Sequence, residues 1–115
     1  MAELKNLDFK KQTDLIMELH DIETALKQED FQARLKAIAA LKTYEDAIAV
    51  PILIRTLHDP EFLVRTFVAM GLSKHQTADA FAALLEILKL DNTPNVRAEA
   101  ANSLSLFGQV SSSHL

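Results

Sequence analysis

The residues with the clearest capacity for metal binding are the four histidines. His20 and Glu23 stand three residues apart, so on a helix an imidazole and a carboxylate would share one face, as in helical metal centres. Such a centre needs a second pair from a facing helix, and no matching partner stands near His58, His75 or His114. We therefore predict no metal site, and we expect the histidines at the surface, at helix ends and in loops.

Nucleophilic catalysis would have to use a serine or threonine, because the chain has no cysteine. The serines at 111–113 precede His114, but this loop-like tail has neither a positioned base nor a strand-to-helix elbow. No glycine-rich phosphate loop is present in the sequence. The lack of cysteine also excludes disulfides and thiolate metal sites. The sequence therefore predicts no catalytic residue and no cofactor.

Three arginines, Arg34, Arg65 and Arg97, stand 31 and 32 residues apart in matching surroundings. A small apolar residue precedes each arginine, and a small residue followed by leucine closes the unit six and seven positions later. Repetition with a period of about 20–50 residues is typical of a solenoid, in which each unit buries its apolar face only against a neighbour. The sequence therefore predicts stacked repeats.

The elements that must position these arginines read as helices. A second apolar segment follows each of the first two arginines, and its apolar residues recur at i, i+3, i+4 and i+7, which indicates a helix stripe and not a strand. These stripes are Val50, Leu53, Ile54 and Leu57, and then Phe81, Leu84, Leu85 and Leu88. We expect six helices, near 10–27, 30–42, 45–58, 60–72, 77–90 and 94–107, joined by short connections into antiparallel hairpins.

Residues typical of helix ends support these boundaries. The pairs Asp59-Pro60 and Thr93-Pro94 combine a capping side chain with a proline at the first helical position. Thr77 is expected to cap the fifth helix. Gly71 and Gly108 stand where the fourth and sixth helices are expected to end.

Composition bounds the class of protein. The 115 residues are 49% hydrophobic with only two glycines and three prolines, which favours one ordered domain. The net charge of −4 argues against nucleic-acid binding, which needs a basic face. No signal peptide is apparent, and the longest uncharged apolar run, residues 47–54, is too short to span a membrane. We expect a cytoplasmic protein.

The repeats resemble HEAT repeats, and most closely the short bacterial kind called phycobilisome-lyase-like, known from cyanobacteria. The residues that carry the resemblance are Asp59-Pro60-Glu61-Phe62-Leu63-Val64-Arg65 with Ala69, Gly71 and Leu72, echoed by Thr93-Pro94-Asn95-Val96-Arg97 with Ala100, Ala101 and Leu104, and by Ala49-Val50-Pro51-Ile52-Leu53-Ile54. The resemblance covers about residues 13–108. It implies an all-α fold, an αα-hairpin solenoid of about three repeats with right-handed stacking, and it is less specific for function.

The resemblance also implies a ladder in which the aspartate of one turn meets the arginine of a repeat. The expected members, six residues apart in two repeats, are Asp59 with Arg65 and Asp91 with Arg97. In the first copy Gln28 stands at the equivalent place, with Glu29 and Asp30 as substitutes. We expect the ladder to fix the register between repeats, because partly exposed ion pairs stabilise by only about 0–1 kcal/mol.

The second helices of a HEAT stack line its concave face, so the resemblance implies that their off-core residues contact a partner. This predicted ridge consists of Met17, Ile48, Ile52, Arg55, Ala83 and Glu86. Exposed apolar residues often mark contacts with another chain. Ile48 and Ile52 therefore have two interpretations, as partner contacts or as part of the core.

A possible second contact lies on the convex side, where Phe67 and Met70 are apolar at positions that are normally polar. Three explanations are open: a bound protein, a self-association contact, or cover by the N-terminal extension, whose apolar residues are Leu4, Leu7 and Phe9.

The domain plan is an extension at 1–9, helical repeats over 10–108, and a tail at 109–115 that begins a further helix. The repeats start with a lone second helix and end with a lone first helix, which predicts self-association through residues 96–107. We expect a non-catalytic protein-binding module. The resemblance implies a role in phycobilisome assembly, chromophorylation or turnover, with a phycobiliprotein as the partner. One alternative is a subunit of a phycobilin lyase that attaches or removes the bilin. Another is a structural fragment of a longer HEAT scaffold.

Overall fold

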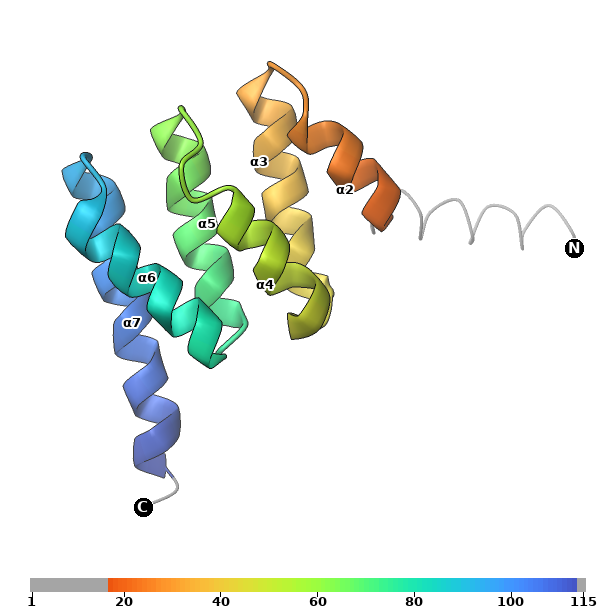
Figure 1. Ribbon diagram of the computed structural model, residues 1–115. Helices are drawn as coiled ribbons and strands as arrows, with labels where there is room; N and C mark the ends of the chain where they lie inside the picture. Colours follow the sequence, from red (N-terminus) through yellow and green to blue (C-terminus); the bar gives the residue numbers. More distant parts are fainter. Residues whose placement is uncertain (1–16, 114–115) are drawn as a thin grey trace, which may run out of the picture.

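The computed structural model describes residues 17–113, and in this part the chain forms helices and no strand. In chain order the elements are α2 (Leu19–Leu26), α3 (Phe31–Ala40), the short 3-10 helix η1 (Leu41–Thr43), α4 (Asp46–Arg55), α5 (Phe62–Lys74), α6 (Ala78–Leu90) and α7 (Pro94–Ser113). Successive α-helices run antiparallel, and the hairpins stack side by side (Figure 1). The predicted all-α solenoid is confirmed.

The helices form two layers (Figure 1). Helices α3, α5 and α7, which carry the three arginines, make one layer, called here the A layer. Helices α2, α4 and α6 make the other, called here the B layer. Helix α5 packs against both α3 and α7, so the A layer is continuous along the stack, and in the B layer α4 packs against α6.

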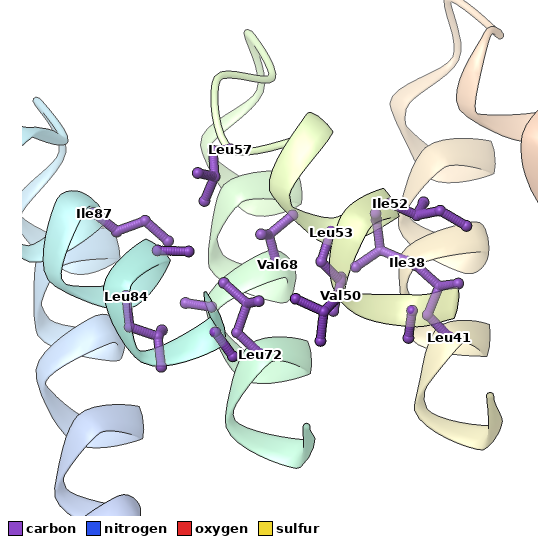
Figure 2. Packing of buried hydrophobic residues seen from close by; sticks show 14 of the residues in the cluster. Ile38, Leu41, Val50, Ile52, Leu53, Leu57, Val68, Leu72, Leu84 and Ile87 are labelled. Carbon is purple, nitrogen blue, oxygen red and sulfur yellow. The ribbon is translucent and has the colours of Figure 1, made fainter. Parts of the chain in front are cut away.

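The core lies between the layers and follows the 31-residue register. Ile22, Leu53 and Leu84 occupy equivalent positions in the three B helices, and all three are fully buried. Leu41 of η1 and Leu72 of α5 are fully buried as well. Figure 2 shows these leucines among the buried side chains of the hydrophobic cluster.

Side-chain caps or a proline mark the starts of three helices, α3, α6 and α7. Thr77 caps α6 as predicted, since its hydroxyl accepts a hydrogen bond from the backbone nitrogen of Ala80 at 3.1 Å. Pro94 is the first residue of α7, also as predicted. Pro60 is not the first residue of α5, because Asp59 accepts a hydrogen bond from the backbone nitrogen of Glu61 at 2.9 Å. This turn delays α5 to Phe62.

The predicted helix ends at the two glycines are wrong. Gly71 lies inside α5 and Gly108 inside α7, which continues to Ser113, so residues 109–113 belong to this helix. A glycine ends a helix by adopting a left-handed conformation. No glycine among the described residues has a positive φ angle, so both remain helical.

The first helix is shorter than predicted. Glu18 is extended, with φ −72° and ψ 154°, and α2 begins only at Leu19. The backbone oxygen of Met17 accepts a hydrogen bond from the hydroxyl of Tyr44, which fixes the start of the described chain beside η1. Residues 1–16, with the predicted extension 1–9, lie outside the described part.

Candidate functional site

Two arginines of the A layer bind aspartates of the following turn through paired hydrogen bonds. Arg34 Nε lies 2.8 Å from Asp59 Oδ2 and its Nη2 lies 3.1 Å from Oδ1. Arg65 repeats this with Asp91, at 2.8 Å and 3.4 Å. These side chains are only 6–12% exposed. The hydrogen bond to Asp59 raises the pKa of the Arg34 guanidinium above its ordinary value.

Each arginine also holds the turn that precedes its own helix. The Nη1 group of Arg65 donates to the backbone oxygen of Asp59 at 2.7 Å, and that of Arg97 donates to Asp91 at the same distance. Arg34 donates in the same way to Gln28 and Glu29. The guanidinium groups of Arg34 and Arg65 therefore each connect two successive turns. The arginines of the two complete pairs are occupied by these contacts and are not open to bind a free anion.

The three described histidines lie apart from one another in the fold. His20 and His58 are exposed, as predicted, and His114 lies outside the described residues. In the described part no group of three potential ligands stands together. The prediction of a surface position is wrong for His75, which is 3% exposed.

His75 joins two hairpins. Its Nδ1 lies 2.7 Å from Asp46 Oδ1 in α4, and its Nε2 lies 3.1 Å from the backbone oxygen of Leu41 in η1. These partners precede it by 29 and 34 residues, so no local pattern identifies them. The ring thus fixes the end of α5 against the connection between α3 and α4, which is a structural role.

The predicted ridge on the B layer is exposed only in part. Arg55 is exposed, and Met17, Ile48 and Glu86 are half-buried. Ile52 and Ala83 are only 6% exposed each and belong to the hydrophobic core. Figure 2 shows Ile52 among the core side chains. Of the two interpretations of Ile52, the core position is therefore correct, because α4 buries a wider arc than one helix stripe.

A groove runs between α4 and α6 on the B layer. It has a volume of about 230 Å³, and its lining residues are Ile54, Leu57, Asp79, Ala82, Ala83 and Glu86. Ala82 and Asp79 are exposed in it. Two polar side-chain pairs link elements of this layer: Arg55 of α4 with Glu23 of α2 at 2.8 Å, and His58 with Glu86 of α6 at 3.2 Å. The groove thus combines an apolar floor with an acidic rim.

A second groove lies on the A layer between α3 and α5. Phe67 is half-buried there and Met70 is 44% exposed. The groove has a volume of about 190 Å³, and its lining residues are Ile38, Ala39, Lys42, Phe67, Met70, Gly71 and Lys74. Its charged residues are the two lysines, so its rim is basic where that of the B-layer groove is acidic.

The comparisons with known proteins agree with this geometry. A family model described as HEAT repeats matches residues 21–105. The chain belongs to the HEAT-repeat family. Neither the curated proteins nor the solved structures gave a match. HEAT repeats generally mediate protein–protein interaction. No helix of the described HEAT domain is both long enough and apolar enough to cross a membrane.

Proposed function

We propose that this HEAT-repeat chain is a non-catalytic protein-binding module whose contact surface is the B layer. The exposed side chains of this surface are those of the α4–α6 groove, above all Asp79 and Ala82, together with Arg55. Met17, Ile48 and Glu86 extend the surface, and the buried Ile52 and Ala83 support it from below. The observation that carries the proposal is the apolar groove with two carboxylates at its rim on a HEAT scaffold.

The charge of the groove favours a partner segment in which an apolar side chain is flanked by basic residues. Asp79 would pair with one basic group, and Glu86 would exchange its contact with His58 for the other. Ile54 and Ala82 would contact the apolar side chain. Charge complementarity of this kind selects partners and speeds association.

Two matched substitutions test the surface. Ala82→Arg places a long cation in the B-layer groove, whereas Ala39→Arg does the same in the A-layer groove, and both alanines are exposed on helices. Partner proteins captured from the host should be lost with Ala82→Arg and kept with Ala39→Arg. The reverse result would place the contact on the A layer, and capture by both variants would contradict both surfaces.

A finer form of the proposal names a phycobiliprotein as the partner, in the cytoplasm, and it rests on the resemblance carried by residues 59–65 and 93–97. Mixing the chain with purified apo-phycobiliprotein and free bilin separates two roles. A binding module forms a complex without changing the bilin absorbance. A lyase subunit would change the absorbance as the bilin is attached or released, and absence of any complex would contradict this partner.

A further inference from the structure

The arginine ladder has an incomplete member at each end of the described stack. Arg34 and Arg65 each hold a backbone oxygen through Nη1 and a carboxylate through Nε. Arg97 holds the backbone oxygen of Asp91 at 2.7 Å, but no carboxylate of the described residues pairs with it. Among the described residues Arg97 is therefore the donor half of a joint without its acceptor half.

A substitute for the acceptor half, placed two residues later in the repeat than Asp59 and Asp91, stands at the opposite end of the described stack. Asp59 and Asp91 each accept a hydrogen bond from the backbone nitrogen two residues later, at 2.9 Å. Asp30 makes the same bond to the nitrogen of Gln32, at 3.1 Å. It stands in the turn between a B helix, α2, and an A helix, α3, as Asp91 does between α6 and α7. Unlike the other two aspartates, it is exposed and has no arginine partner among the described residues.

The packing faces at the two ends are incomplete in the same way. Ala69 of α5 is fully buried under α7, whose Ser103 hydroxyl donates to its backbone oxygen at 3.2 Å. Its equivalent in α7, Ala101, is exposed. Leu72 is fully buried, whereas its equivalent Leu104 is only partly buried. The face of α7 that would receive a further hairpin is therefore uncovered by the described residues.

Helix α2, the B helix at the other end, is less buried than its equivalent α4 in the middle of the stack. Leu19 of α2 is 38% exposed, whereas Val50, its equivalent in α4, is 5% exposed. Leu26 is half-buried, whereas its equivalent Leu57 is 6% exposed. Within the stack an A helix is followed by a B helix, a turn and the next A helix. Helix α2, the turn after it and α3 form one unit of B helix, turn and A helix. In the described part no such unit follows α7, which is itself an A helix.

We infer that the α7 end of one copy binds the α2–α3 end of a second copy, with Asp30 of the second copy paired to Arg97 of the first. The new joint would repeat the Arg34–Asp59 and Arg65–Asp91 joints between copies. Because the two surfaces differ, the association is head-to-tail, and each dimer leaves one donor end and one acceptor end open for growth.

Sedimentation velocity of the full chain across a concentration series tests this inference. Self-association should be concentration-dependent, and Arg97→Glu should raise the dissociation constant by about thirtyfold or more, as expected on breaking a shielded charge pair. Asp30→Arg should do the same. Lys74→Glu, a charge reversal at an exposed position of α5 in the middle of the stack, should have no effect.

Mixing the two charge-reversed variants identifies the geometry. The Arg97→Glu variant keeps Asp30, and the Asp30→Arg variant keeps Arg97. Each variant alone should be monomeric, and the two should form a complex when mixed. A chain that is monomeric at every concentration would overturn the inference. So would an Asp30→Arg variant that still dimerises, because that would indicate a face-to-face contact through α7. Circular dichroism of each variant verifies folding, and Asp30→Asn, which keeps the cap but not the charge, replaces Asp30→Arg if the latter unfolds.

Discussion

Gly71 of α5 lies so close to Leu53 of α4 that a methyl group at Gly71 would stand 3.1 Å from Leu53 Cδ2 and 3.3 Å from Cδ1. Glycine in a helix interior costs about 1 kcal/mol relative to alanine. Here the missing side chain lets a fully buried leucine of the B layer pack directly on the A helix. The glycine is thus explained by close packing and not by a helix end.

This contact predicts opposite effects of one substitution in two backgrounds. Gly71→Ala alone should destabilise by about 1 kcal/mol, because the crowding of Leu53 outweighs the gain in helix propensity. In a Leu53→Ala background the same substitution should stabilise by about 1 kcal/mol. Urea unfolding of the four proteins measures the coupling. Equal effects in both backgrounds would show that the two residues do not constrain each other.

The ladder predicts that burial, not distance, decides the cost of losing an ion pair. Arg65–Asp91 and Arg55–Glu23 both have 2.8 Å contacts, but the side chains are 12% and 6% exposed in the first pair and 59% and 41% in the second. Arg65→Gln should cost about 2–4 kcal/mol, because Asp91 stays buried without its partner. Arg55→Gln should cost less than about 1 kcal/mol. Similar losses in thermal melts would refute this explanation.

The buried histidine gives a third prediction. His75→Ala removes the donor to the buried backbone oxygen of Leu41 and leaves a cavity, so unfolding should become easier by about 2–4 kcal/mol. His58→Ala is the matched control, since His58 is exposed and its pair with Glu86 lies at the surface. Its effect should stay within about 0.5 kcal/mol. Equal midpoints of chemical unfolding for the two variants would mean that the His75 contacts do not hold the hairpins together.

Core packing gives a fourth prediction. Leu84 is fully buried and Leu90, in the same helix, is 74% exposed. Leu84→Ala should cost about 2–5 kcal/mol, a large share of the stability of a short solenoid, and Leu53→Ala should cost a similar amount. Leu90→Ala should be nearly neutral. Calorimetric or circular-dichroism melts that show equal effects at positions 84 and 90 would mean that the repeat register is wrong.

The sequence was sufficient for the parts of the fold that repeat. Ile22, Leu53 and Leu84 could be placed in the core because each stands on a helical stripe and 31 residues from the next. Thr77 could be assigned as a cap because a capping bond reaches only three residues along the chain. Such features depend on local spacing, which a single sequence displays.

Contacts between different hairpins could not be predicted in this way. The burial of His75 depends on its contacts with Asp46 and Leu41. The presence of Gly71 inside a helix is explained by its close contact with Leu53. The residues next to His75 and Gly71 in the sequence indicate neither contact. Ile52 was ambiguous for the same reason, since its burial depends on how many helices α4 touches. The groove residue Ala82 gave no signal, because an exposed alanine is common in any helix.

The last prediction concerns Phe67 and Met70, for which the sequence leaves open three occupants. The chain has no cysteine, so Met70→Cys introduces a single thiol in the A-layer groove without background labelling. Because Met70 is 44% exposed, we expect rapid labelling by a thiol reagent at low protein concentration. Labelling that slows as the concentration rises would indicate a second copy in the groove, and slow labelling that becomes rapid when residues 1–9 are deleted would indicate the N-terminal extension. A rate that stays high in both tests leaves the groove free for a different protein, and its two lysines then favour an apolar segment flanked by carboxylates.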